Sequence, residues 1–199
     1  MRVGTKSILF GVHNILVHPL SVAIAWWKLY GFPGDPRLWC AFILHDLGYW
    51  GLSAMESVGS ETHVELGARI MTWLFGAPWG EFCASHSRCF ARSRGVPVSQ
   101  LCIADKLAFV LTPPWLYLPL ARATGELQEY IAKSRERPVG SAAFTEEERK
   151  QIESEDPRLW LEGLQNYTRR WIEQHGNGGV GTWTGIAAQR NALPFWRAR

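Results

Sequence analysis

The amino-acid sequence predicts an all-α protein, and three observations support this prediction. Apolar residues recur at i, i+3, i+4 and i+7 along most of the chain, which is the period of a helix packed on one face. Alternation of apolar and polar residues over strand-length runs is scarce. Helix-starting signals precede several of the periodic stretches, such as Thr145 followed by Glu148 in a capping-box pattern. The expected architecture is a helical bundle with a C-terminal helical extension.

The expected elements follow from caps and breakers along the chain. In the first part, helices are expected at about residues 19–30, 37–48, 62–76, 79–91 and 99–112. Thr62 with Glu65 forms a capping-box pattern, Ser99 is a suitable N-cap, and Pro113-Pro114 ends the fifth helix. Later, a capped helix begins at Thr145, and a strongly amphipathic helix follows Asp156-Pro157. Its apolar face consists of Trp160, Leu164, Tyr167 and Trp171.

Composition and charge narrow the range of partners. The formal charge of +3 is too small for a surface that coats a nucleic-acid polymer, so no such partner is expected. The apolar run from Ile8 to Trp27 is interrupted by His13, His18 and Pro19, which argues against a signal peptide or a membrane span. The four cysteines form no CxxC pair, which fits a reducing cytoplasm. We expect a cytoplasmic protein without a membrane partner, and leave its oligomeric state open.

The 11 tryptophans are unusual for a chain of this length. One interpretation is a tryptophan-rich core, because aromatic side chains belong to cores more often than to sites. The alternative is an aromatic pocket that stacks a nucleobase. The sequence does not choose between the two.

The positions of the titratable residues carry most of the functional information. Four histidines and one aspartate fall on the apolar faces of successive predicted helices, at His18, His45, His63, His86 and Asp105, and Asp46 directly follows His45. Burial of a lone carboxylate is costly, so imidazoles and carboxylates gathered in a core indicate a shared partner. A divalent cation fits, because neutral imidazole and carboxylate are its ligands. Taken singly, each has an ordinary alternative: a core histidine, or Asp105 paired with Arg88 or Lys106.

The order of these residues resembles the HD superfamily of metal-dependent phosphohydrolases. The resemblance covers about residues 10–112 and is carried by His18-Pro19-Leu20-Ser21-Val22-Ala23, Leu44-His45-Asp46-Leu47-Gly48, His63-Val64-Glu65-Leu66-Gly67-Ala68, His86 and Ala104-Asp105-Lys106-Leu107. It implies a helical bundle with a metal site at its centre. We accordingly divide the chain into an HD-type metal-binding helical domain, residues 1–135, and a C-terminal helical extension with a loosely ordered tail, residues 136–199.

The resemblance also implies a ligand set. His18, His45, Asp46 and Asp105 match the set that holds one metal ion in the family. His63 and His86 are similar to the extra ligands of members that hold two ions, which Asp46 would bridge. We therefore expect two divalent transition-metal ions, iron or manganese, with zinc, cobalt and nickel as alternatives. Asp46, His63 and His86 are the expected catalytic residues.

The expected reaction is hydrolysis of a nucleotide or another small phosphate ester or anhydride. The GYP signature of the HD-GYP phosphodiesterases is absent, because Leu47-Gly48-Tyr49-Trp50-Gly51 stands in its place. Substrate contacts are expected from the connections between the ligand helices, including the loop of residues 49–61. The candidates are Trp50, which could stack a base, and the cations Arg88, Arg92, Arg94 and Lys106, whose alternative role is as ordinary surface charges. Lys106 is expected to point about 100° away from Asp105 on their helix.

Three alternatives remain at this point. His13 competes with His18 as the first ligand, but His18 is favoured because Val22-Ala23 follow it as in the family. HD-fold mixed-valent di-iron oxygenases have a closely similar ligand set, and oxygen consumption would separate them from hydrolases. An inactive HD-fold binding module would fail to retain metal.

Overall fold

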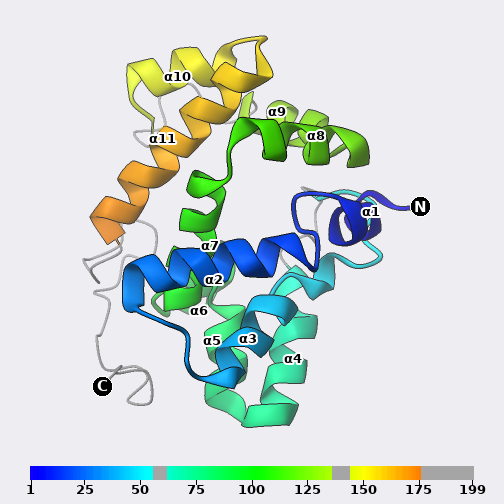
Figure 1. Ribbon diagram of the computed structural model, residues 1–199, viewed down its shortest axis with the longest axis vertical. Helices are drawn as coiled ribbons and strands as arrows, with labels where there is room; N and C mark the ends of the chain where they lie inside the picture. Colours follow the sequence, from blue (N-terminus) through cyan, green and yellow to red (C-terminus); the bar gives the residue numbers. More distant parts are fainter. Residues whose placement is uncertain (56–61, 136–143, 176–199) are drawn as a thin grey trace.

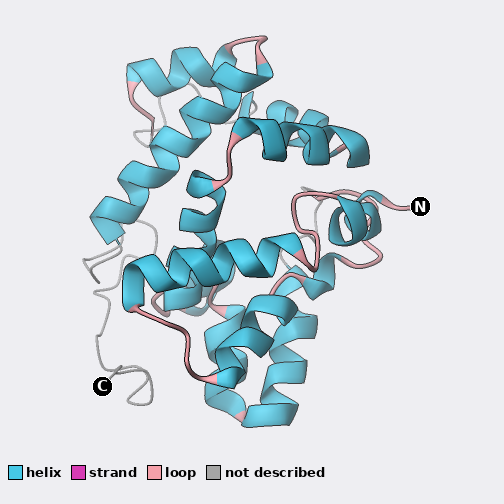
Figure 2. Cartoon of the chain, viewed as in Figure 1, coloured by secondary structure: helices cyan, strands magenta, loops and turns pink. Residues whose placement is uncertain are grey.

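The computed structural model describes residues 1–55, 62–135 and 144–175. Within these ranges all of the regular secondary structure is helical, which confirms the predicted fold class (Figure 2). The glycine-rich segment after residue 175, expected to form a loosely ordered tail, lies outside the described residues. So does the second half of the loop of residues 49–61.

The described residues form eleven α-helices and one 3₁₀ turn. In order they are α1 (Val3–Phe10), α2 (Val17–Tyr30), α3 (Pro36–Leu44), the single 3₁₀ turn η1 (Leu47–Tyr49), α4 (His63–Phe75), α5 (Ala77–Ala84), α6 (Arg88–Arg94), α7 (Gln100–Leu111), α8 (Pro114–Thr124), α9 (Glu126–Arg135), α10 (Glu146–Glu153) and α11 (Pro157–His175).

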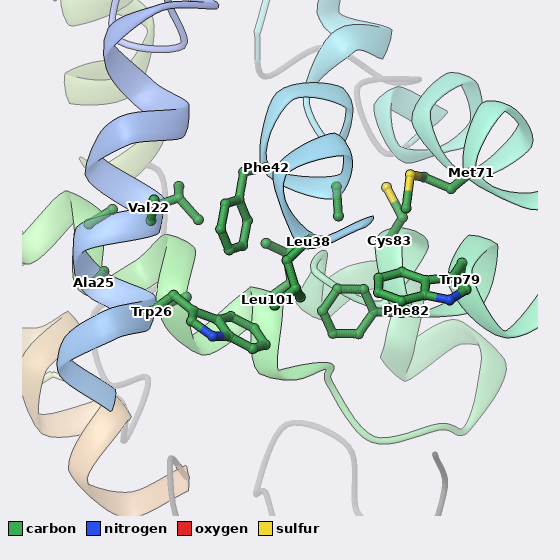
Figure 3. Packing of buried hydrophobic residues seen from close by; sticks show 14 residues of the cluster. Val22, Ala25, Trp26, Leu38, Phe42, Met71, Trp79, Phe82, Cys83 and Leu101 are labelled. Carbon is green, nitrogen blue, oxygen red and sulfur yellow. The ribbon is translucent and has the colours of Figure 1, made fainter. Parts of the chain in front are cut away.

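Helices α2 and α7 pack on each other in the middle of the molecule and separate two groups of helices (Figure 1). Helices α3, α4 and α5 lie on one side, and α8 to α11 lie on the other. The first group encloses the larger apolar core, in which Trp26 of α2 and Phe42 of α3 meet Phe82 of α5 and Leu101 of α7 (Figure 3). Burial of such large apolar side chains is the main driving force for this packing.

The second group has its own apolar cluster. Tyr117 and Leu118 of α8 pack with Leu127 of α9 and with Trp160 and Leu161 of α11. A third, smaller cluster joins α11 to α7 through the side chains of Cys102, Ile103, Val110, Trp171 and Ile172. Helix α11 therefore anchors the second group to the central helices.

The helix expected over residues 37–48 ends earlier, at Leu44, and η1 follows it. Asp46 lies between them with φ −99° and ψ 2°, outside the helical region. Neighbouring residues on a regular helix point about 100° apart. Ending the helix at this point frees His45 and Asp46 to approach the same site.

The helix expected over residues 79–91 is also wrong as one element, because two helices, α5 and α6, replace it. The break contains Ser85, His86 and Ser87. Ser87 caps α6 by accepting a hydrogen bond from the backbone N–H of Phe90. The signal for this break in the sequence is Ser87, because serine favours the N-cap position of a helix even where the apolar period continues.

The other predicted boundaries have mixed outcomes. The Thr145–Glu148 capping box is present, whereas the side chain of Thr62 caps no backbone N–H of α4. Pro113-Pro114 does end α7, but Pro114 also opens α8, because proline is suited to the first turn of a helix. Helices α1, α8 and α9 were not expected.

Membrane-spanning potential is limited in the described part of the chain. No single described helix is long and apolar enough to cross a bilayer. Helices α7 and α8 reach the required length and apolar content only when they are taken together, and they are bent by 102° relative to each other.

Candidate metal centre

Six side chains from separate elements converge between α2, α3 and α7. His18 lies in the first turn of α2, His45 directly follows α3, and Asp46 precedes η1. The remaining three are His63 at the start of α4, His86 in the break between α5 and α6, and Asp105 in the middle of α7. Five of the six lie at helix ends or in breaks, so helix ends rather than helix faces build most of the site.

The first donor group consists of His18, His45, Asp46 and Asp105, whose donor atoms lie within 4.8 Å of one another. The Nε2 atoms of His18 and His45 are 3.2 Å apart. Each of them also lies 3.2 Å from Oδ2 of Asp46. Oδ1 of Asp105 is 3.3 Å from His18 Nε2. Two imidazoles and two carboxylates therefore face one point.

The second donor group consists of Asp46, His63 and His86. The Nε2 atoms of His63 and His86 are 3.3 Å apart. Oδ1 of Asp46 lies 3.3 Å from His86 Nε2 and 4.0 Å from His63 Nε2. Asp46 thus presents one carboxylate oxygen to each donor group, which is the arrangement of a bridging ligand.

Backbone contacts fix the orientation of two of the imidazoles. Nδ1 of His45 donates a hydrogen bond to the carbonyl oxygen of Phe42 at 3.0 Å, and Nδ1 of His86 donates to that of Cys83 at 2.6 Å. A neutral imidazole that donates through Nδ1 carries a lone pair on Nε2. The partner that accepts from Nδ1 in this way is the usual support of a metal-binding histidine.

This arrangement fits a metal ion better than a network of hydrogen bonds. In its neutral form His86 presents the lone pair of Nε2 to Oδ1 of Asp46, 3.3 Å away, and an ion between these two acceptors would satisfy both. Two ligands that sit about 2.1 Å from one ion lie roughly 3.0–3.4 Å apart. Six donor pairs of the site lie 3.2–3.3 Å apart, and two pairs are wider, His45–Asp105 at 3.9 Å and His63–Asp46 at 4.0 Å. Imidazole and carboxylate are ligands of divalent transition metals. The six residues therefore form buried groups able to hold metal.

Electrostatic effects in the site favour the charged forms of both carboxylates. Burial alone would raise the pKa of Asp46, but the imidazoles of His45 and His18 hold that pKa well below its usual range. Burial likewise opposes ionisation of Asp105, but Lys106 and His18 together outweigh burial and lower the pKa of that carboxyl. Burial lowers the pKa of His45. The lowered pKa values keep both carboxylates charged, as metal ligands must be.

His18 behaves differently when no ion is bound. Burial would lower its pKa, but Asp105 and Asp46 outweigh burial and raise the pKa of His18 to about 9. The carboxylates thus hold a proton on His18 at neutral pH. A metal ion would have to displace that proton.

Two glycines allow the close approach of helices that brings His63 to Asp46. A methyl group on Gly48 would overlap the backbone of His63, and one on Gly67 would overlap the carbonyl oxygen of Leu44. Only glycine permits such backbone contact. Both glycines belong to the segments that carry the family resemblance, so these segments encode the packing of α4 on α3 and η1 as well as ligands.

A cavity of about 270 Å³ opens beside the first donor group, and His18 and Asp105 form part of its wall. Lys106 and Arg88 also line it. The side chain of Lys106 curls back to its neighbour, with Nζ 2.7 Å from Oδ2 of Asp105, so the expectation that it points away is wrong. Arg88 lies over the ring of Trp171, 5.0 Å from its centre.

The other sequence-predicted substrate residues lie elsewhere. Arg92 and Arg94 are exposed on α6, and Trp50 is 54% exposed; none of the three lines this cavity. Substrate contact by these residues stays a prediction. The tryptophans themselves are divided: Trp26, Trp79, Trp160 and Trp171 are buried, whereas Trp27, Trp73 and Trp115 are exposed.

Two residues of the site were not singled out from the sequence. Tyr49 stacks on His63, with ring centres 4.4 Å apart and planes 8° apart, and it lines the cavity. Glu126 is fully buried, and its Oε2 lies 3.6 Å from Nδ1 of His13. His13 belongs to neither donor group, although its Nε2 lies 3.9 Å from Oδ2 of Asp46. Tyr49 could have been found from its place directly after the His45–Asp46 doublet; nothing local marks Glu126.

Comparison of the chain with protein-family models, curated proteins and solved structures gives no match. The fold and the site together define the class: an all-α protein with two adjoining buried His/Asp groups suited to binding metal.

Proposed function

We propose that this chain is an HD-type metal-dependent phosphohydrolase, which cleaves a small phosphate ester or anhydride with water. The observation that carries the proposal is the position of Asp46, whose two carboxylate oxygens face separate donor groups. Such a bridging carboxylate is suited to a pair of ions about 3.5–4 Å apart, a recurrent arrangement in phosphate-ester hydrolysis. The order of the ligands along the chain, which resembles the HD superfamily, supports the same proposal.

The surroundings of the metal centre suit a phosphorylated substrate. Lys106 and Arg88 bring two positive charges to the cavity wall, next to the ligand Asp105. Guanidinium and ammonium groups bind phosphate oxygens through charge-assisted hydrogen bonds. Bound divalent ions would supply a water of lowered pKa and would polarise the phosphoryl group. Tyr49 stacks on the His63 ring and so supports its orientation.

The test is an assay of phosphate release by protein loaded with manganese, iron or cobalt. Nucleoside monophosphates, deoxynucleoside triphosphates, dinucleoside polyphosphates and simple phosphate monoesters serve as substrates. We expect metal-dependent release from at least one class. The variant Asp46→Asn should abolish it, whereas Glu155→Gln, an exposed carboxylate on the loop before α11, should not.

Three results would overturn the proposal. One is the absence of phosphate release from every class by protein that holds its metal. Another is release that persists in Asp46→Asn. The third is oxygen uptake by the iron-loaded protein without phosphate release, which would favour the oxygenase alternative.

A further inference from the structure

The cavity beside the metal centre has two chemically different sides. On the side of α2 and α7 its wall carries His18, Asp105 and Lys106, with Arg88 from α6. The other wall comes from α8, α9 and α11, helices of the second group in Figure 1. It is built mainly from the apolar side chains of Leu116, Tyr117, Leu120, Trp160 and Leu164, and Phe109 of α7 continues it.

Three hydroxyl groups in the cavity wall already donate their hydrogen bonds within the protein. Thr112, Ser134 and Thr168 each donate a hydrogen bond to a backbone carbonyl three or four residues earlier in the chain. Ser134 also accepts a hydrogen bond from the indole N–H of Trp160. Lys133 lines the cavity as well, but it is exposed. A ribose or nucleobase would leave several of its own polar groups poorly satisfied against such a wall, and each such loss is costly.

Two leucines show that the apolar wall is open to a ligand. Tyr117 and Leu118 of α8 pack into the buried cluster with α11. Leu116 and Leu120, on the same helix, are only half-buried and line the cavity. An apolar group that enters the cavity would remove them from water, which stabilises the complex in proportion to the buried area.

The size of the cavity also limits the ligand. Its volume of about 270 Å³ falls just below the range of roughly 300–1,000 Å³ that is typical of small-molecule sites. It suits one compact molecule with a single charged end.

From this two-sided wall we infer the substrate class, on the basis of the hydrolase function proposed above. The substrate is a phosphate monoester whose organic part is apolar, such as an alkyl or aryl phosphate. Its phosphate lies at the metal centre with Lys106 and Arg88, and its apolar part lies against Leu116, Leu120 and Trp160. In the reaction, water attacks phosphorus, the P–O bond to the organic part breaks, and the products are inorganic phosphate and an apolar alcohol or phenol.

Alkylphosphonates test the inference without turnover, because their C–P bond is not cleaved by this reaction. Calorimetry measures the affinity of the metal-loaded protein for methyl-, butyl-, hexyl- and octylphosphonate and for adenosine monophosphate. We expect affinity to rise by about fourfold per added methylene until the cavity is filled. The binding should have a negative heat-capacity change, which marks apolar burial. Octylphosphonate should bind at least tenfold more tightly than the nucleotide.

Variants of the cavity wall test whether it causes the dependence of alkylphosphonate affinity on chain length. Leu120→Asn and, independently, Leu116→Asn should each remove most of the dependence on chain length while leaving methylphosphonate binding unchanged. Leu159→Asn, on the exposed side of α11 and outside the cavity, is the matched control and should behave as the wild-type protein. Thermal unfolding confirms that each variant is folded.

The possible failures are distinguishable. Affinity independent of chain length, or tighter binding of the nucleotide than of every alkylphosphonate, would overturn the inferred substrate class and leave a phosphohydrolase of other specificity. Chain-length-dependent binding together with no metal-dependent phosphate release would overturn the proposed function and leave the binding site.

Discussion

The two donor groups share Asp46 but differ in charge and in the way the fold supports them. The first group has a second carboxylate, Asp105, which comes from the middle of α7 and is neutralised on its other oxygen by Lys106. The second group adds only imidazoles, His63 at the start of α4 and His86 in a helix break. The first group thus offers four donors, two of them carboxylates, whereas the second offers three donors with only the shared carboxylate. We therefore expect a tight first ion and a weaker, more exchangeable second ion.

Removal of the shared ligand should have the largest effect. Asp46→Ala leaves the first group with three donors and the second with two imidazoles, so most of both ions should be lost. Activity should fall by roughly a thousandfold or more, because metal ions supply several kcal/mol of transition-state stabilisation. Elemental analysis and phosphate release measure the two effects. Retention of two ions per chain would contradict the bridging role of Asp46.

Removal of His63 should affect metal binding by the second group alone. His63→Ala disrupts only the second group, so the protein should keep one ion and lose most of its activity. His13→Ala serves as the control for metal content: His13 lies close to Asp46 but outside both groups, and this variant should keep both ions. If His63→Ala lost both ions, or if His13→Ala lost one, the division into these two groups would be wrong.

The close packing of α4 offers a subtler way to weaken the second ion. Gly67→Ala places a methyl group against the carbonyl oxygen of Leu44 and should push α4 away from α3. Overpacking of this kind costs about 1–3 kcal/mol of stability. We expect a lower melting temperature and a larger loss of affinity for the second ion than for the first. Gly34→Ala, at a glycine with space for a methyl group, is the control. Equal loss of both ions would contradict this account.

The mildest perturbation is a change of pH without any substitution, and it should alter metal binding by the first group. In the metal-free protein Asp105 and Asp46 outweigh burial and raise the pKa of His18 to about 9, from 6.5 for the free side chain. Metal binding displaces this proton, so affinity for the first ion should rise by about tenfold per pH unit from neutral pH to about 9. Metal titrations at several pH values measure the slope, and a flat response would contradict it.

The same shift predicts how the metal-free protein responds to pH. A raised pKa means that the folded state binds the proton more tightly than the unfolded state does. The resulting stability is fully present below pH 6.5 and is lost as the pH rises through about 9. Unfolding of the metal-free protein in urea at increasing pH should show this decline, and saturation with metal should remove it.

Some residues of the two donor groups could be predicted from the sequence, and others could not. Apolar periodicity placed His18 and Asp105 correctly on α2 and α7, because local helix propensity and burial agree there. It failed at His86, since the period of apolar residues continues across the break that Ser87 caps. It also failed for the direction of Lys106, because a long side chain can turn back toward a neighbouring carboxylate.

The cavity was beyond prediction from local patterns. Its apolar wall depends on α8, which turns away directly after α7, and on α11, which packs on α7 and α8 from a distant part of the chain. Pro113-Pro114 predicted only the end of a helix, although the second proline also begins α8. Gly48 and Gly67, in contrast, indicate close helix packing, because a glycine beside ligand residues allows two backbones to touch. The prediction of the ligands did not draw on these glycines.

The central claim is that Asp46 joins two metal ions in one site. Manganese titration of the metal-free protein, followed by calorimetry and by electron paramagnetic resonance on the same samples, tests it most directly. We predict two ions per chain, the first bound more tightly, and a spin-coupled signal that appears only as the second ion binds. A single ion at saturation, or two ions without magnetic coupling, would contradict the claim.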